Sequence, residues 1–512
     1  MAFSHTEISH EPPAPTGVVE SFRYAFSSPT RLRKEVLAGL TVALALIPEA
    51  IAFSILAGVD PALGLFASVV MAITIAFTGG RPAMISAATG AVALVIAPVA
   101  REYGLDYFIA TVLLAGVLQI VLAVLGVAKL QRFIPRSVMT GFVNALGILI
   151  FTAQLEHLID VPKVVYVLVA AGIAIMIGWP KITGAIPAPL ITIVIISAVV
   201  GLTGMNVPTV SDMGELPESL PRLFVPDVPL TLETLQIIAP YSLAMAIVGL
   251  LESLMTAKLV DDITDTHSDK TRESWGQGVA NIASGLFGGM GGCAMIGQTM
   301  INVKESGART RLSTLLAGVF LLILILVLGD VVGMIPMAAL VAIMIMVSVG
   351  TIDWHSVHPR TLKFMPLSET VVMLVTVVAT LATSNLAVGV VLGVITAMIT
   401  FARRVAHLAS VEQVSAEDTT NDGQVDTRTY RIHGQLFWAS SNDLVYAFDY
   451  TDPADNIVLD LSAAEVWDAS TVATLDSVTR KFEERGKTVT IVGLAGPSKD
   501  RLDRLSGKLD GQ

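Results

Sequence analysis

The sequence predicts an α-helical protein that crosses a membrane many times and ends in a small α/β domain. Hydrophobic residues make up 53% of the 512 residues and charged residues only 15%, whereas soluble domains carry about 25% charge. Apolar stretches of roughly 17 to 25 residues, the length that a bilayer requires, recur through the first four fifths of the chain. Lysine and arginine gather in alternate connections between these stretches, which is the pattern of cytoplasmic loops.

Fourteen spans are predicted, and the third and the tenth are too short or too rich in glycine to cross as continuous helices. With the N-terminus in the cytoplasm, an even number of crossings puts the C-terminus there as well. The expected location is the cell inner membrane. The longest outer loop, 205–235, is acidic, in agreement with this orientation. The spans lie at 36–57, 62–78, 84–99, 106–126, 138–158, 163–178, 187–204, 237–258, 275–289, 296–303, 311–333, 335–351, 367–383 and 385–402.

The two interrupted spans share a sequence pattern. The chain reads "GGRPAMISAATGAV" at 79–92 and "GGCAMIGQTMINV" at 291–303, so that Ser86 and Gly297 fall at matching places. The two copies are seven spans apart, and an odd number of crossings inverts one copy relative to the other in the membrane. Chance similarity in an Ala/Gly-rich chain is the alternative, but the agreement with the span count favours an inverted repeat.

Interrupted helices within a membrane are typical of secondary transporters with a substrate site near the midplane. A helix that begins inside the bilayer exposes unpaired N–H groups and the positive end of its dipole, which together attract an anion. The glycines of "GLFGGMGGCAMIGQTMINV", at 285–303, allow an extended segment to turn into such a helix. Close packing of helices is the alternative role for these glycines, but it does not account for Gln298 and Thr299 within the membrane.

Two acidic residues lie inside predicted spans at corresponding places in the two halves, Glu49 in the first span and Glu252 in the eighth. An ionisable group within a span is a candidate functional residue, either a proton carrier or an ion ligand. Pro48 removes a backbone donor beside Glu49, and Thr256 shares a helix face with Glu252 at a spacing of four. A purely structural hydrogen-bonding role for each acid is the alternative.

The motif block at 276–313, together with "DDITDTHSDKTRESW" and "LIPEAIAFS", resembles the SulP family of anion transporters. The resemblance covers the chain from about residue 30 to its end. It implies two inverted repeats of seven spans, a core domain that moves against a gate domain, a cytoplasmic STAS domain and assembly as a homodimer. Members move sulfate, bicarbonate, chloride or dicarboxylates.

The resemblance also implies the residues of the site. Two departures bear on the mechanism: Gln298 and Thr299 stand near where many members have an arginine, and Glu252 stands where sodium-coupled members have an aspartate. Coupling to H+ is therefore favoured, and Na+ held by Glu252 and Thr256 is the alternative. The implied substrate-binding residues are Glu49, Phe53, Ser86, Ala87, Ala88, Thr89, Gly90, Gly297, Gln298 and Thr299, and the implied coupling-ion residues are Glu49, Glu252 and Thr256.

The last part of the chain follows a short-strand and helix pattern of about ninety residues, enough to fold alone. It resembles a compact STAS domain. Ser470 stands where signalling relatives carry a phosphorylated serine, but Thr471 replaces the glycine expected next, which favours a plain helix N-cap over phosphorylation. The predicted division of the chain is a cytoplasmic tail (1–34), a transmembrane transporter domain (35–404), a linker (405–425) and a STAS domain (426–512).

The function that follows is secondary active transport of a small anion, coupled to H+, without a cofactor, a metal or a nucleic-acid partner. Three rivals are a channel or exchanger of the same fold, a sodium-coupled bicarbonate symporter, and a membrane anchor for STAS signalling. An intramembrane enzyme is disfavoured because HExxH is lacking and "VLGD", at 327–330, lacks the first glycine of GxGD. A single cysteine, Cys293, rules out a disulfide framework and a multi-cysteine metal site within the chain.

Overall fold

The computed structural model describes most of the chain as two compact units, Met1–Val394 and Ile395–Gln512. Residues 1–14 of the predicted tail and 418–424 of the predicted linker lie outside the described residues. The described ranges are 15–126, 129, 134–182, 188–214, 220–406, 409–417, 425–441 and 444–508.

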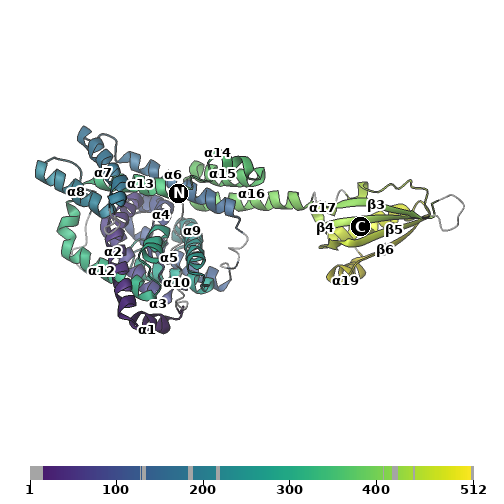
Figure 1. Cartoon of the computed structure of the whole chain (residues 1–512), viewed down its shortest axis with the longest axis horizontal. Helices are drawn as coiled ribbons and strands as arrows, with labels where there is room; N and C mark the ends of the chain where they lie inside the picture. The colour runs from purple at the N-terminus through teal and green to yellow at the C-terminus, as the bar shows by residue number, and fades with distance from the viewer. Residues whose placement is uncertain are drawn as a thin grey trace. The chain divides into compact units, whose positions relative to one another are not determined.

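Each of the fourteen predicted spans coincides with a helix or half-helix of the described residues (Figure 1). Eight of these helices are long and apolar enough by themselves to cross a membrane. Several extend beyond their predicted bounds, because hydropathy marks only the apolar part of a helix whose polar turns continue past it. The helix predicted at 237–258, for example, occupies Leu232–Thr264.

The helices of the first unit form two groups, with dense packing within each group and few contacts between them. This division matches the predicted core and gate domains. The core group contains α2 (Pro29–Ala57), α3 (Pro61–Thr78), α4 (Gly90–Tyr103), α5 (Leu105–Val124), α9 (Leu232–Thr264), α10 (Lys270–Leu286), α11 (Ile296–Met300) and α12 (Arg311–Gly333). The gate group contains α6 (Arg136–Glu156), α7 (Lys163–Ile182), α8 (Ala188–Thr203), α13 (Met337–Thr351), α15 (Leu367–Thr383) and the first residues of α16 (Leu386–Ala406). Three shorter elements complete the described part of the unit: α1 (Val18–Phe26), η2 (Val210–Met213) and α14 (Pro359–Phe364).

The third and tenth spans are interrupted, as the glycine content predicted. An extended segment stands before each half-helix: β1 (Ser86–Ala88), in the third span, pairs with β2 (Gly292–Ala294), just before the predicted start of the tenth, as a short antiparallel ladder. The half-helix α4 follows β1, and α11 follows β2 and continues as a π-helical turn, η3 (Ile301–Glu305). The ladder satisfies the backbone groups that a broken helix leaves free, which a membrane interior requires. The antiparallel pairing agrees with the inverted repeat.

The residues of the ladder are small because helices enclose it on all sides. Every residue of β1 and β2 is buried. At Gly292, an added Cβ atom would overlap the carbonyl oxygen of Ala87 on the opposite strand. Only glycine therefore lets the two strands approach this closely.

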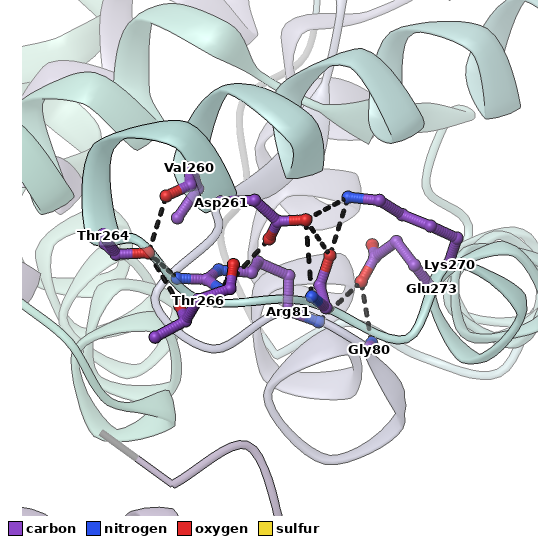
Figure 2. Close-up of polar contacts among 9 residues, drawn as sticks. Gly80, Arg81, Val260, Asp261, Thr264, Thr266, Lys270 and Glu273 are labelled. Atoms are coloured by element: carbon purple, nitrogen blue, oxygen red, sulfur yellow. Dashed lines mark hydrogen bonds and ion pairs between the residues drawn. The ribbon is translucent and has the colours of Figure 1, made fainter. Parts of the chain in front are cut away.

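A cluster of polar side chains lies at the C-terminal end of α9 and connects it to the segment that precedes β1 (Figure 2). The Asp261 carboxylate pairs with Arg81 at 3.1 Å and with Lys270 at 2.7 Å. Glu273 of α10 accepts hydrogen bonds from the backbone N–H groups of Gly80 and Arg81 at 2.8 and 3.1 Å. Asp261 lies in the last turns of α9, and these two ion pairs leave its side chain only 11% exposed.

The second unit contains a four-stranded sheet in the order β3-β4-β5-β6. The pair β3–β4 is antiparallel, and the pairs β4–β5 and β5–β6 are parallel. The first strand lies within the segment 405–425 that the sequence suggested as a linker, because its polar residues hide its strand character. The elements are β3 (Ser410–Glu417), β4 (Thr427–Leu436), α17 (Trp438–Ser441), η4 (Leu444–Tyr446), β5 (Asn456–Val466), α18 (Ala469–Glu483), β6 (Thr488–Val492) and α19 (Gly496–Leu505).

The helix α18 packs on this sheet through one apolar face, with Leu475, Val478 and Phe482 of successive turns in the shared core. Its N-cap is Asp468, whose carboxylate accepts from the Thr471 N–H at 2.9 Å. The prediction of Ser470 as the N-cap is therefore wrong. Ser470 lies one residue inside the helix and is exposed, so its regulatory role stays a prediction.

The charged pair of Asp460 and Arg431 in this sheet predicts a dependence of stability on pH. Two hydrogen bonds from Ser462 and the contact with Arg431 at 2.8 Å lower the pKa of Asp460 to about 2. A carboxylate with a lowered pKa stabilises the fold above its ordinary pKa, and this stability is lost as the pH falls toward about 2. We expect Asp460→Asn to lower the free energy of unfolding by about 1 kcal/mol or less at neutral pH, since Arg431 is partly exposed. The measurement is the midpoint of urea unfolding of residues 405–512 as a function of pH. In the variant, this midpoint should fall less steeply toward acid pH, which is the acid limb of the curve. An unchanged acid limb would contradict this role for Asp460.

Candidate functional site

The starts of the two half-helices lie next to each other because of the β1–β2 ladder. The register pairs Ser86 with Ala294, and α4 and α11 begin within four residues of these positions. Neither N-cap residue, Thr89 for α4 nor Met295 for α11, caps its helix with a side chain. The first-turn N–H groups of both half-helices are therefore free of side-chain caps and available to an acceptor.

A cavity of about 330 Å³ adjoins these helix starts. Its core-group wall includes Thr89 and Gly90 at the start of α4 and Gly297 of α11. Its gate-group wall includes Phe142 of α6 and Thr351 of α13. The cavity thus lies between the two helix groups.

Two acidic side chains reach this cavity, one from each half of the chain. Glu49 of α2 and Glu252 of α9 both line it. The Glu252 side chain is buried, and one carboxylate oxygen accepts from the Cys293 thiol at 2.9 Å. The side chain of Gln298 lies beside the Glu49 carboxyl group, and its own amide oxygen has no partner among the described atoms.

Basic side chains are missing from the described residues that line the cavity. Backbone N–H groups, hydroxyl groups and the positive ends of helices are the groups of this lining that attract an anion. The two carboxyl groups would repel an anion when both are ionised. Binding of a cation at one of them removes part of this repulsion, which links the two ligands electrostatically.

Phe53 and Gly90 form one wall of the cavity together. A Cβ atom on Gly90 would lie only 2.8 Å from the Phe53 ring. The ring therefore packs directly on the first residue of α4. This contact gives a physical reason for glycine at the position where an anion would meet the helix backbone.

Several residues that the sequence suggested for substrate binding lie behind the cavity wall. Ser86 accepts a hydrogen bond from Gln277 at 2.6 Å, and Ala87 and Ala88 belong to the buried ladder. Thr299 accepts from the Ile85 N–H at 3.0 Å. These side chains are in contact with protein partners that hold the ladder and α11 in place.

Thr256 follows Glu252 on α9, as the spacing predicted, but its hydroxyl group points to backbone oxygens. It donates to the Glu252 carbonyl at 2.8 Å and lies 3.4 Å from the Ala294 carbonyl. The pair of a carboxylate and a hydroxyl that the sequence suggested for Na+ is thus not arranged around one common point in this structure.

Sequence reasoning missed the residues that complete the site. Cys293 contacts Glu252, but a single cysteine in an apolar segment gives no sign of a polar role. The gate-group residues of the cavity, such as Phe142, Ile150 and Val347, are ordinary apolar residues of apolar spans. No pattern in the sequence separates them from residues that face lipid.

Comparison with known families identifies the transmembrane part. Residues 32–182 and 166–376 match the sulfate permease family. The chain belongs to the sulfate permease family. Residues 417–507 match the STAS domain. The predicted family and fold class are confirmed, and as a member of this family the chain is an anion transporter and not an enzyme.

The relatives of this chain include proteins named for two different anions. It is 49% identical to "Putative sulfate transporter YbaR" of Bacillus subtilis (strain 168) over 475 residues. These residues make up 93% of this chain and 97% of that protein. It is 27% identical to the bicarbonate transporter BicA of Picosynechococcus sp., over 93% of this chain and 91% of that protein.

Two solved structures share the fold. The murine Slc26a9 anion transporter superposes with a TM-score of 0.80 at 16% identity, over 98% of this chain and 92% of that chain. The transmembrane domain of a cyanobacterial BicA superposes with a TM-score of 0.61 at 26% identity, over 72% of this chain and 98% of that chain. The fold of this chain is therefore shared with both.

Proposed function

We propose that this protein is a secondary active transporter that moves a small anion together with H+ across the inner membrane by alternating access. One observation carries the proposal. A cavity between the core and gate groups joins the uncapped start of α4 to two carboxyl groups, Glu49 and Glu252, with no basic side chain among its described lining residues. This arrangement offers an anion a place beside groups that can take up a proton.

Sulfate is the anion to test first, because the relative at 49% identity is named for it. Bicarbonate, for which a more distant relative is named, and a C4-dicarboxylate are the alternatives. In this proposal the anion contacts the N–H groups at the starts of α4 and α11, with Phe53, Thr89, Gly90, Gly297 and Gln298 nearest to it. Ser86, Ala87, Ala88 and Thr299 support these groups from behind.

H+ is favoured over Na+ as the coupling ion. Hard cations prefer several oxygen ligands, whereas the Glu252 carboxylate contacts a thiol and the Thr256 hydroxyl is turned toward backbone carbonyls. A carboxyl group needs no further ligand to bind a proton. Sodium-coupled bicarbonate symport and exchange or channel activity are the rival functions.

The test is uptake of radiolabelled sulfate, bicarbonate and succinate into proteoliposomes that contain the purified full chain. An inward H+ gradient is expected to drive accumulation that a protonophore abolishes and that an Na+ gradient does not replace. Accumulation driven only by Na+ would favour the sodium rival. Uptake whose rate and extent depend on neither the H+ gradient nor the Na+ gradient would refute coupled transport.

Removal of residues 405–512 gives a second prediction, which separates a transporter from a membrane anchor for STAS signalling. We expect the truncated chain to keep sulfate uptake within about tenfold of the full chain, about 1.4 kcal/mol in activation free energy, because every described lining residue of the cavity precedes residue 352. Uptake is measured per molecule inserted, since we also propose that the STAS domain supports assembly of a homodimer. Complete loss of uptake by a monodisperse truncated protein would contradict the prediction.

A further inference from the structure

Cys293 makes two polar contacts from a fully buried position in β2. Its sulfur lies 2.9 Å from a carboxylate oxygen of Glu252 and 3.1 Å from the hydroxyl oxygen of Thr89. A buried cysteine usually behaves as a small apolar residue. Here its sulfur joins two polar side chains that come from different helices.

Both partners of Cys293 line the cavity, whereas Cys293 lies behind its wall. Glu252 presents a carboxyl group from α9, and Thr89 is the residue at which α4 begins. The Thr89 hydroxyl does not cap α4, although threonine at this position normally does. This hydroxyl instead contacts the sulfur of Cys293.

The hydrogen-bond capacity of these three groups allows two arrangements. A thiol and a hydroxyl each carry one hydrogen and can also accept, whereas an ionised carboxylate can only accept. With Glu252 ionised, the thiol donates to the carboxylate and the Thr89 hydroxyl donates to the sulfur. With a proton on Glu252, the carboxyl O–H donates to the sulfur and the thiol donates to Thr89. The Thr89 O–H is then free to point into the cavity.

We propose that Cys293 is a positioning residue that couples cation binding at Glu252 to anion binding at the start of α4. The inference rests on the proposed function and adds the physical link between its two ligands. Protonation of Glu252 releases the Thr89 hydroxyl as an additional donor for the anion. By reciprocity, a bound anion that holds this donor favours the protonated carboxyl group.

The other ionisable groups near this contact chain have different partners. Glu49 is the other carboxyl group among the described lining residues of the cavity, and it lies beside Gln298. Glu273 of α10 contacts Gln277 and the backbone of Gly80. Glu49→Gln therefore serves as a background in which the contribution of Glu252 is measured without its neighbour.

The test is equilibrium binding of radiolabelled sulfate to the purified full chain at two pH values, one below and one above neutrality. Sulfate keeps its charge over this range, so the ratio of the two dissociation constants measures a change in the protonation of the protein and not of the anion. We expect tighter binding by the wild type at the lower pH, with a ratio of at least about five, the lower end of typical coupling factors. Measured in the Glu49→Gln background, Cys293→Ala is expected to lower this ratio to the part that direct repulsion by Glu252 supplies, and Cys293→Ser, which can donate and accept, to preserve most of it.

Thr89→Val provides the second arm, because it removes the hydroxyl and keeps the shape of the side chain. It is expected to lower the ratio as Cys293→Ala does, and the double variant is expected to lower it no further. A Cys293→Ala protein that binds more weakly at both pH values with an unchanged ratio would show a merely structural role and overturn the inference. A wild type without pH dependence, or without sulfate binding, would instead count against the proposed function itself.

Discussion

Replacement of Glu252 by glutamine is expected to reduce H+-driven accumulation of the anion by at least about tenfold, a coupling loss within the usual range for linked sites. Glutamine has nearly the same shape and can still accept from the Cys293 thiol, which now lies 2.9 Å from the carboxylate. It cannot bind a proton. The anion site should therefore persist while the driving force is lost.

Two transport modes measured on the same proteoliposomes check this expectation. Accumulation against a gradient needs net movement of H+, whereas exchange of labelled for unlabelled anion does not. Glu252→Gln should lose the first mode and keep the second. Glu102→Gln is the matched control, since Glu102 is exposed at the end of α4, and it should change neither mode. If Glu252→Gln still accumulates the anion, Glu252 does not carry the coupling ion, and Glu49 becomes the candidate to test.

Replacement of Gly292 by alanine is expected to cost at least about 3 kcal/mol in stability, at the upper end of the range for overpacking. The added methyl group would overlap the carbonyl oxygen of Ala87 and lie 2.6 Å from the Met71 sulfur. The backbone cannot give way easily, because Asn281 holds both the N–H and the carbonyl of Gly292, at 2.9 and 3.1 Å. Separation of β1 from β2 would also separate the starts of α4 and α11.

The matched control is Gly297→Ala, five residues further along the same motif, where an added Cβ atom meets nothing within 4 Å. Melting of the detergent-solubilised proteins, followed by intrinsic fluorescence, gives the comparison. Gly292→Ala should melt about 6 °C or more below the wild type, at roughly 2–4 °C per kcal/mol, or yield little monodisperse protein. Gly297→Ala should melt near the wild type. Equal melting of the two variants would mean that the ladder tolerates a side chain and does not fix the site.

The sequence predicted the polytopic fold well because hydropathy is a local property. Each apolar stretch long enough for a bilayer became a helix, and the two stretches broken by glycine became a strand followed by a half-helix. The two acids within apolar spans, Glu49 and Glu252, stood out for the same reason, since a charged group in an apolar run costs free energy wherever the run packs.

The sequence was less informative about which side chains face the cavity. Ser86 and Thr299 are polar residues of the interrupted spans, yet they bond to Gln277 and to the Ile85 backbone. Strand residues alternate between two faces, and when both faces are buried a sequence does not distinguish them. The strand β3 was missed for another reason. It lies at the edge of its sheet, and its mostly polar residues do not alternate with apolar ones as they do in a half-buried strand.

By itself, then, the sequence determined the helical membrane fold, the two interrupted spans, the family and the presence of acids within the bilayer. The contacts of Cys293 with Glu252 and Thr89, and the ion pairs of the partly buried Asp261 with Arg81 and Lys270, could be seen only in the folded chain. The physical reason is that hydropathy and backbone preference act over a few residues. The partner of a buried polar group is instead chosen by segments that lie far away along the chain and meet only when the helices pack.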